Sequence, residues 1–345
     1  MIEADAELAQ LTAEAPAIPG LRFRRLRLPD DLAGLTEMHA RAAAVDQDDE
    51  VHSVEEWESW FASPWGFDPA TDVVVGEVDG QVVAYAQARA VDDNDGGRDY
   101  TVGGEVHPEW RHRGIGRALL RHNVRHQQER GRREAALEPN GASRERRLES
   151  GARETAVPRV RLLESEGFTA VRWFFEMVRP NLDDIADLPL PDGLEIRPVQ
   201  PEDHAAIWAA DQEAFRDHWG AQPEGDVGFD LFFAAPDFRP DLWRVAWDGD
   251  QVAGVVMNRI MAAFNEGSGE RRGELAGVSV RRPWRRRGLA RALVAESLRA
   301  LRDDGMTSAA LGVDAENPTG ALSVYEANGF VVHSRGTNYR RPLFD

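Results

Sequence analysis

One motif occurs twice in this 345-residue chain and constrains its fold more than any other feature. It reads RHRGIGRALL from residue 111 and RRRGLARALV from residue 285. Each copy follows a short apolar run, at residues 102–106 and 275–280, and opens a segment with helical apolar periodicity. This pattern predicts a strand, a glycine turn and a helix. Amides at the start of such a helix bind anions and glycine permits close approach, so each motif predicts a pyrophosphate site.

Further matches extend the repeat over most of the chain. Gly114 and Gly288 are 174 positions apart, and a Gly-Phe pair at Gly167 recurs 162 positions later at Gly329. The Ala-Ala-Leu at residues 135–137 matches residues 309–311 at the spacing of 174, which predicts the next strand in each copy. A period this long indicates duplicated domains of about 160 residues each rather than a solenoid.

Hairpin and turn signals fill in the rest of each copy. In the first half, strands are expected at residues 73–78 and 81–88, joined by Asp-Gly. In the second half, we expect strands at 242–248 and 251–260, a polar loop at 265–273, a helix at 319–327, and final strands at 329–332 and 337–342. The predicted fold is α/β (α+β mixed), with a central, mostly antiparallel mixed sheet and flanking helices in each domain. The predicted boundaries are an extension at 1–19, a first domain at 20–180, a Pro- and Asp-rich linker at 181–192 and a second domain at 193–345.

Composition limits the classes of partner. The formal charge of −19 disfavours nucleic acid and anionic membranes, since both require a basic surface. Cysteine is absent, the N-terminus lacks the pattern of a secretory signal, and no apolar stretch is long enough to span a bilayer. We therefore expect a cytoplasmic protein without a disulfide framework and without a bound metal. All 41 basic residues are arginine, and they crowd the two turns, which favours a polyanionic ligand there.

The order of elements and the Arg-x-x-Gly-x-Gly/Ala turn resemble the Gcn5-related N-acetyltransferase (GNAT) superfamily, over nearly the whole chain and twice. A dinucleotide-binding Rossmann unit fits less well, because several strands precede the turn. The resemblance implies that the turn binds the pyrophosphate of acetyl-CoA and that the preceding strand pairs with its pantetheine arm. The cofactor-binding residues implied in the second half are Val278, Ser279, Val280, Arg285, Arg286, Arg287, Gly288, Leu289, Ala290, Arg291 and Asn317. Those implied in the first half are Arg111, Arg113, Gly114, Ile115, Gly116 and Arg117.

The two halves differ at the positions that the family uses for chemistry. Tyr325 stands where a catalytic acid is expected, and Leu163 stands at the same place in the first half. The first half also contains a charged insertion around residues 144–153. We therefore expect the first domain to be degenerate and the second to be catalytic.

The reaction implied is direct attack of a primary amine of a small molecule on the thioester carbonyl, without a covalent enzyme intermediate. A backbone amide near Val278 would stabilise the oxyanion, and Tyr325 would protonate the departing sulfur. Glu274 is the first candidate for the base, with Glu213 and His218 as rivals. The residues expected to form the acceptor pocket are Glu213, Phe215, His218 and Trp219.

Two other functions fit the sequence. The chain is alternatively a non-catalytic acyl-CoA-binding sensor, or a tandem GNAT-like enzyme that transfers aminoacyl groups from tRNA. The acidic charge disfavours the tRNA alternative. A sensor has no use for an acid at Tyr325, so the Tyr325→Phe variant separates a sensor from an enzyme. The expected state is a monomer that forms an internal pseudo-dimer, or a homodimer.

Overall fold

The structure is a computed structural model that describes residues 2–62, 65–138, 144–216, 218–221, 229, 232–233, 235–317 and 320–344. It divides into two compact units. The first unit contains Met1–Val171 and Thr337–Asp345, and the second unit contains Arg172–Gly336. No helix among the described residues is long and apolar enough to cross a bilayer.

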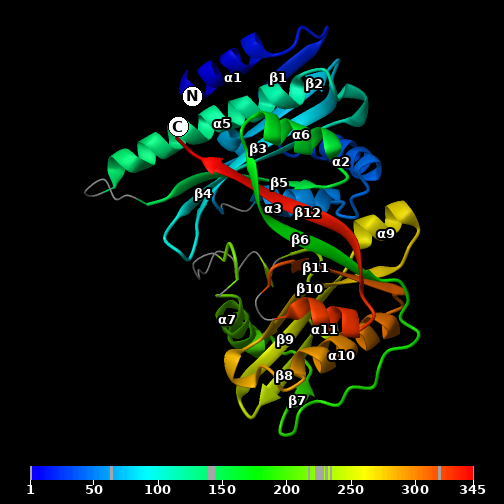
Figure 1. The fold of residues 1–345 in the computed structure, drawn as a ribbon. Helices are drawn as coiled ribbons and strands as arrows, with labels where there is room; N and C mark the ends of the chain where they lie inside the picture. The colour runs from blue at the N-terminus through cyan, green and yellow to red at the C-terminus, as the bar shows by residue number, and fades with distance from the viewer. Residues whose placement is uncertain are drawn as a thin grey trace. The chain divides into compact units, whose positions relative to one another are not determined.

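The first unit is a mixed domain of helices and strands that begins with a helix (Figure 1). Its elements are α1 (Ile2–Glu14), β1 (Leu21–Arg25), α2 (Leu32–Asp46), α3 (Val54–Ala62), α4 (Pro69–Asp72), β2 (Val73–Val78), β3 (Gln81–Asp92), β4 (Arg98–Val106), η1 (Pro108–Trp110), α5 (Ile115–Leu137), β5 (Arg146–Arg153) and α6 (Val157–Ser165). The strand β6 (Thr169–Arg179) leads from the first unit into the second.

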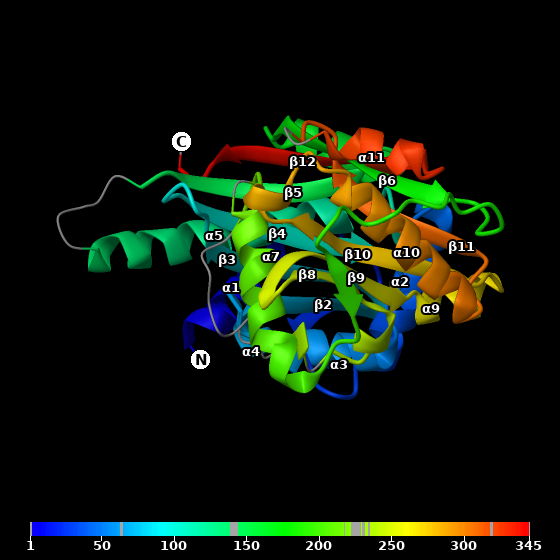
Figure 2. The same ribbon diagram turned by 90° about the horizontal axis from the view of Figure 1, so that it is seen from below.

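The second unit repeats the order of the strands and of the helices that follow the glycine turn, and it has an additional helix, α9, between its third and fourth strands (Figure 2). Its elements are β7 (Glu195–Arg197), η3 (Pro201–Asp203), α7 (His204–Phe215), η4 (Pro240–Leu242), β8 (Arg244–Asp248), β9 (Gln251–Ile260), α9 (Ala262–Ser268), β10 (Arg272–Val280), η5 (Arg282–Trp284), α10 (Leu289–Asp303), β11 (Ser308–Asp314) and α11 (Ala321–Ala327). The strand β12 (Val331–Pro342) leads back into the first unit.

Each unit has a mixed sheet that is antiparallel except at one place. In the first unit β1, β2, β3 and β4 pair antiparallel in that order, and β4 pairs parallel with β5. In the second unit β7, β8, β9 and β10 do the same, and β10 pairs parallel with β11. The parallel pair follows from the helix that crosses over between its strands. This confirms the mixed, mostly antiparallel sheet predicted from the sequence.

Helices cover both faces of each sheet, because the strands present apolar side chains on both faces. On β9, Ala253 and Val256 belong to the core under α10, whereas Val252 and Val255 belong to the core that includes Ile207 of α7. Residues three positions apart share a core because the register of β9 on β8 shifts between Val252 and Gly254, which marks a β-bulge at Ala253. One apolar strand thus supplies both cores. Figure 2 shows α7 and α10 on either side of β8–β10. The first unit repeats the arrangement, with α2 and α5 on the two faces.

The two units exchange their last strands. Residues 174–179 of β6 pair antiparallel with residues 309–314 of β11 in the second unit. Residues 337–344 complete the first unit, where Tyr339 and Leu343 are buried beside Leu148 and the Leu343 amide donates to the Arg146 carbonyl at 3.1 Å. Figure 1 shows this end of β12, in red, beside β5. The unit boundaries at residues 171 and 336 therefore differ from the predicted boundaries at 180 and 193, because the sequence does not reveal which half each final strand joins.

Four predicted elements differ in the structure. The Ala-Ala-Leu at residues 135–137 lies in α5 rather than in a strand, because α5 is longer than α10. The charged segment at 144–153 is largely β5, whose arginines pair with carboxylates, as Arg147 does with Asp99 at 2.8 Å. The predicted loop at 265–273 contains most of α9 and the start of β10. Residues 331–342 form one continuous strand instead of two.

A histidine on α5 links α1 to α4 within the first unit. His126 Nδ1 lies 2.9 Å from Glu7 Oε2 on α1, and His126 Nε2 lies 2.8 Å from Asp72 Oδ1. Burial lowers the pKa of His126, but its hydrogen bonds and charge interactions with the two carboxylates outweigh burial and raise the pKa overall. For Asp72 the signs are reversed. Burial raises the pKa of this carboxyl group, but the hydrogen bond from His126 and the charge of Arg130 outweigh burial and lower the pKa overall.

These shifts predict that the stability of the first unit depends on pH. The folded-state pKa of His126 is raised, so its stabilisation is complete below about pH 6.5 and is lost as the pH rises through that pKa. The Asp72 contribution is lost instead as the pH falls in the acid range. We expect the melting temperatures of the wild type and His126→Gln to differ most at mildly acid pH and to converge at alkaline pH, as measured by thermal denaturation. A difference that stays constant with pH would contradict this assignment.

Candidate functional site

The two glycine turns have the same backbone geometry. His112 and Gly114 have φ values of 60° and 90°, and Arg286 and Gly288 have 59° and 87°. Positive φ at the glycine is what allows the turn to lead directly into α5 or α10 with its first amides exposed. Both turns therefore fit a pyrophosphate group at the helix start.

The first arginine of each motif is tied to the strand before the turn. Arg111 Nε donates to the Val106 carbonyl at 3.0 Å, and Arg285 Nε donates to the Val280 carbonyl at 2.8 Å. Arg111 also forms an ion pair with Asp46 at 2.5 Å. Both guanidinium groups thus hold the end of the strand against the turn. These two arginines position the turn, in addition to the cofactor contact expected for them.

The other arginines of the motifs lie nearer to solvent. Arg113 stacks on Trp110, with its Cζ 4.7 Å from the ring centroid, and Arg117 pairs with Glu166 at 3.0 Å. In the second unit Arg286, Arg287 and Arg291 are exposed. Flexible, exposed guanidinium groups beside a helix N-terminus are suited to phosphate contacts.

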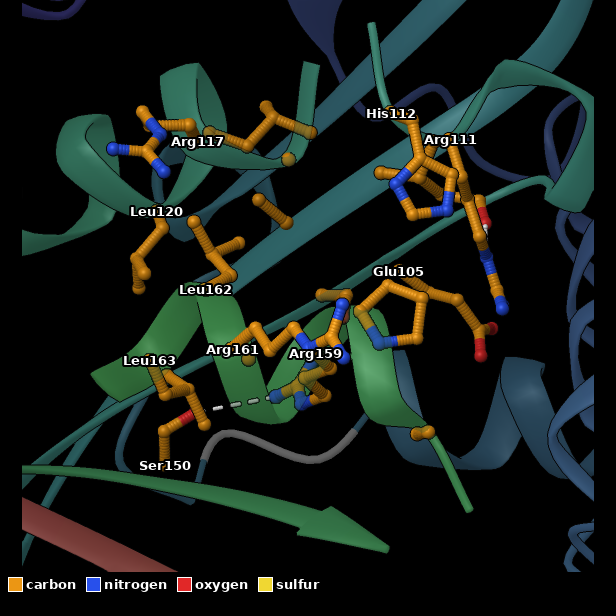
Figure 3. A pocket seen from close by; sticks show the side chains of 18 of the residues that line it. Glu105, Arg111, His112, Arg117, Leu120, Ser150, Arg159, Arg161, Leu162 and Leu163 are labelled. Carbon is orange, nitrogen blue, oxygen red and sulfur yellow. Dashed lines mark hydrogen bonds between the residues drawn. The ribbon is translucent and has the colours of Figure 1, made fainter. Parts of the chain in front are cut away.

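In each unit the two parallel strands part beside the turn. Residues 98–101 of β4 pair with 146–149 of β5, and residues 272–274 of β10 pair with 308–310 of β11. Beyond these residues the strands diverge. In the first unit the gap is part of a cavity of about 780 Å³, a size typical of ligand sites. The turn forms one wall of this cavity, and Figure 3 shows Arg117, Leu120, Leu162 and Leu163 around it.

The diverging edge differs between the units. In β10 the register on β9 shifts between Leu275 and Gly277, which marks a β-bulge at Ala276. In β4 the register on β3 runs without a shift from Val106 to Arg98. A bulge leaves a residue outside the ladder and can aim its amide away from the neighbouring strand. Ala276 of the second unit thus lies outside the ladder, next to the place where the strands part.

Tyr325 and Leu163 occupy the same position in the two units. Tyr325 lies on α11, 6% exposed, with its ring centroid 6.2 Å from that of Phe330. Burial raises the pKa of Tyr325 to about 12, so the hydroxyl keeps its proton at neutral pH. Leu163 on α6 is 2% exposed and packs in the core of the first unit. An acid is therefore available at this position only in the second unit.

Glu274 is the last residue of β10 that pairs with β11. Its Oε2 accepts a hydrogen bond of 2.6 Å from Arg259 Nε, and Arg259 also pairs with Asp237 at 3.2 Å. The rival Glu213 forms an ion pair of 2.7 Å with Arg281. Both carboxylates are therefore fixed by arginines, and Glu274 lies at the point where the strands begin to part.

The residues expected to contact the acceptor lie around the end of α7. The ring centroids of Phe215 and His218 are 4.4 Å apart, and the ring of Trp219 lies 5.9 Å from that of Phe174. Asn317 follows β11, and its amide donates to the Asp314 carbonyl at 3.1 Å. Phe215 and His218 are thus in ring contact with each other, and Trp219 lies against Phe174 of β6.

Sequence reasoning missed a buried carboxyl group on α7. Asp211 is 8% exposed, and its Oδ1 lacks a hydrogen-bond partner within the described parts of the chain. Burial raises the pKa of Asp211 to about 6, and a hydrogen bond with Ser279 of β10 partly offsets this. In the first unit a hydrogen bond of 2.8 Å joins His39 of α2 to Glu105 of β4 at the corresponding place. The only sequence signal was that Glu105 and Ser279 are 174 positions apart.

Residues 34–145 and 204–330 each match the model of the acetyltransferase (GNAT) family. The chain therefore belongs to the GNAT family, with one family domain in each unit. It is similar to a mycothiol acetyltransferase of Streptomyces scabiei, 33% identical over 270 residues that cover 77% of this chain and 77% of the relative. A mycothiol acetyltransferase of Geodermatophilus obscurus is 27% identical over 316 residues, covering 90% of this chain and 95% of the relative. The chain is an N-acetyltransferase of this family, whose acyl donor is acetyl-CoA.

Solved structures agree with the tandem arrangement. A GCN5-related N-acetyltransferase from Sphaerobacter thermophilus matches with a TM-score of 0.71 and 27% identity, covering 95% of this chain and 97% of that chain. A tandem GNAT protein from the clavulanic acid biosynthesis pathway matches with a TM-score of 0.63 and 17% identity, covering 94% and 99%. The second match shows the shared fold only.

Proposed function

We propose that the second unit transfers the acetyl group of acetyl-CoA to a primary amine of a small molecule. The observation that carries this proposal is the difference between the units at matched positions. Tyr325 replaces Leu163, and the bulge at Ala276 has no counterpart in β4. The same turn therefore serves a complete set of reactive groups in one unit and an incomplete set in the other.

Each residue of the second unit has a definite role in the proposed mechanism. The amides that follow Gly288 hold the pyrophosphate, and the edge of β10 at Val278 holds the pantetheine arm. Acetyl-CoA supplies a thioester whose carbonyl carbon is open to attack. The amine nitrogen forms a bond to this carbon, the carbon–sulfur bond breaks, and the products are an amide and CoA thiol. An amide at the bulge of β10 stabilises the oxyanion that forms on the carbonyl oxygen when the amine attacks.

Two proton transfers complete the reaction. Glu274, at the point where the strands part, accepts the proton of the attacking amine, directly or through water. Tyr325 donates its proton to the departing sulfur, and its high pKa keeps that proton in place until the thiolate forms. Asp211 is hydrogen-bonded to Ser279 of β10 and is a second candidate for the base, because burial raises the pKa of its carboxyl group toward neutrality.

The proposed acceptor is an amine on a polar small molecule. The curated relatives are named mycothiol acetyltransferases, and the tandem layout resembles mycothiol synthase, which acetylates the cysteinyl amine of a sugar-inositol thiol precursor. The aromatic residues Phe215, His218 and Trp219 at the end of α7 suit an amphipathic amine of this kind.

The decisive experiment measures acetylated product and CoA together by chromatography with mass detection. The acceptors are aminoglycosides, amino acids, simple amines and cysteinyl amino sugars. We expect one acetyl group on nitrogen for each CoA formed with at least one acceptor class, and the cysteinyl amino sugar is the first choice. Tight binding of acetyl-CoA without any acetylated product would support the sensor instead.

The role of Glu274 is tested by a matched pair of substitutions. We expect Glu274→Gln to lower kcat by about tenfold to a hundredfold, since a positioned base contributes at least this much. Glu213→Gln removes a carboxylate that is also paired with an arginine but belongs to the expected acceptor pocket, so we expect a higher KM for the amine and a kcat within about twofold of the wild type. The measurement is steady-state kinetics at saturating acetyl-CoA. A larger loss in Glu213→Gln than in Glu274→Gln would exchange the two roles.

A further inference from the structure

An arginine bridges the gap between the parting strands of the first unit. Arg159 lies on α6, and its Nε donates to the Gly151 carbonyl of β5 at 2.5 Å. Its Nη1 donates to the Gly104 carbonyl of β4, and its Nη2 donates to the Ser150 hydroxyl at 3.2 Å. Figure 3 shows the Ser150 hydroxyl pointing at Arg159 inside the cavity. One side chain thus connects the edges of two strands that have separated.

The Ser150 hydroxyl binds a second carbonyl on the same edge of β4. Its hydroxyl, on a side chain that is 1% exposed, donates to the Val102 carbonyl of β4 at 2.7 Å. Val102 and Gly104 are two residues apart, so their carbonyls face the same side of β4. Both carbonyls lie beyond the last residue of β4 that pairs with β5. The acceptors that the open edge offers are therefore taken by side chains of the first unit itself.

The register of the parallel strands identifies the matching residues of the second unit. Arg98 pairs with Arg146 in the first unit, and Arg272 pairs with Ser308 in the second. β5 and β11 are thus offset by 162 residues, as are the Gly-Phe pairs after α6 and α11. At this offset the counterpart of Ser150 is Gly312, and the counterpart of Arg159 is Ala321. Neither counterpart has a side-chain donor.

We propose that Ser150 and Arg159 close the first unit to the pantetheine arm, so that each chain binds one acetyl-CoA, in the second unit. An amide-bearing arm binds an open strand edge by donating to its carbonyls and accepting from its amides, as an added strand does. In the first unit the arm must first displace the hydrogen bonds of Ser150 and Arg159. It would also leave a largely desolvated guanidinium without its carbonyl partners, which is costly.

Charge reinforces this exclusion. Burial lowers the pKa of Arg159, with partial compensation from Tyr85 and Glu105. Glu105 is already hydrogen-bonded to His39, and Asp46 is paired with Arg111. The guanidinium therefore depends on the carbonyls of Gly104 and Gly151 and on the Ser150 hydroxyl for its hydrogen bonds. An uncharged acetyl thioester offers it no replacement of similar strength.

The test counts acetyl-CoA equivalents by isothermal titration calorimetry on the full chain. We expect one equivalent for the wild type, none for Gly288→Asp, and two for the double variant S150G/R159A, which copies the second unit. Combining Gly288→Asp with the double variant should restore one equivalent, located in the first unit. Arg161→Ala is the matched control, because it removes an arginine of α6 that also lines the cavity, and it should leave one equivalent.

Several results would overturn the proposal. Two equivalents in the wild type, or one in Gly288→Asp, would show that the arm enters the first unit despite Arg159. A folded double variant that still binds one equivalent would show that other residues close the gap. The first two results need no substitution in the first unit, so they decide the matter even if the double variant is unstable. The inference rests on acetyl-CoA as the ligand and not on the acceptor, so binding counts can succeed where the acceptor assay fails.

Discussion

Gly288→Asp is expected to reduce kcat/KM for acetyl-CoA by about a thousandfold or more, whereas Gly114→Asp is expected to leave it within about twofold. Both glycines have positive φ, 87° and 90°, and both precede the first residue of a helix. Aspartate tolerates this conformation better than most residues, so the backbone of either turn is retained at a cost of about 1 kcal/mol. Its carboxylate, however, lies where a pyrophosphate must bind.

Each substitution is the control for the other, because both place the same side chain at the same position of a turn. A Cβ on Gly288 meets no atom within 4 Å, and a Cβ on Gly114 meets Pro16 at 3.6 Å, so neither creates a clash. We expect similar small decreases in melting temperature for both variants. Only the unit that performs the reaction should show the kinetic loss. Equal losses of activity, or a greater loss in Gly114→Asp, would move catalysis to the first unit.

Tyr325→Phe is expected to lower kcat by about a hundredfold to a thousandfold while KM for acetyl-CoA changes little, since general acid catalysis contributes about this much. Phenylalanine keeps the ring contact with Phe330 and the burial of the side chain, so binding and folding are preserved. What is lost is the proton that the departing sulfur requires. The split between kcat and KM distinguishes an acid from a residue that merely shapes the site.

Tyr339→Phe is the matched control for this experiment. Tyr339 is 5% exposed and lies in the core of the first unit, and burial raises its pKa as it does for Tyr325. Removal of its hydroxyl should leave kcat unchanged. If both variants lose activity in proportion to their loss of stability, Tyr325 has a structural role, and the proton must come from water or another group.

The repeated motif explains why so much of the fold was predictable. The spacing of 174 located both turns, and the spacing of 162 matched Leu163 to Tyr325 from the order of residues alone. Strands β2 and β9 have the predicted bounds because alternation and Asp-Gly turns are local signals. The strand predicted at residues 135–137 was wrong, because it rested on a local signal alone and a short apolar run does not distinguish a helix from a strand.

The remaining features depend on contacts between distant segments. Nothing local in Arg159 or Ser150 indicates that they donate to carbonyls of β4, because the sequence does not state how α6 and β5 lie against that strand. Asp211 reads as an ordinary polar residue of a helix, and only its burial beside Ser279 distinguishes it. The bulge at Ala276 is invisible without the register of β10 on β9.

The exchanged last strands also determine when each unit can be finished during synthesis. The whole of the second unit, residues 172–336, is translated between the two parts of the first unit. The core around Leu148 in the first unit therefore stays incompletely covered until residues 337–344 leave the ribosome, because Tyr339 and Leu343 belong to that core. The second unit, which is continuous in sequence, has no such delay. The half that begins translation first is thus the last to reach its native state, and the part expected to carry out catalysis can fold ahead of it.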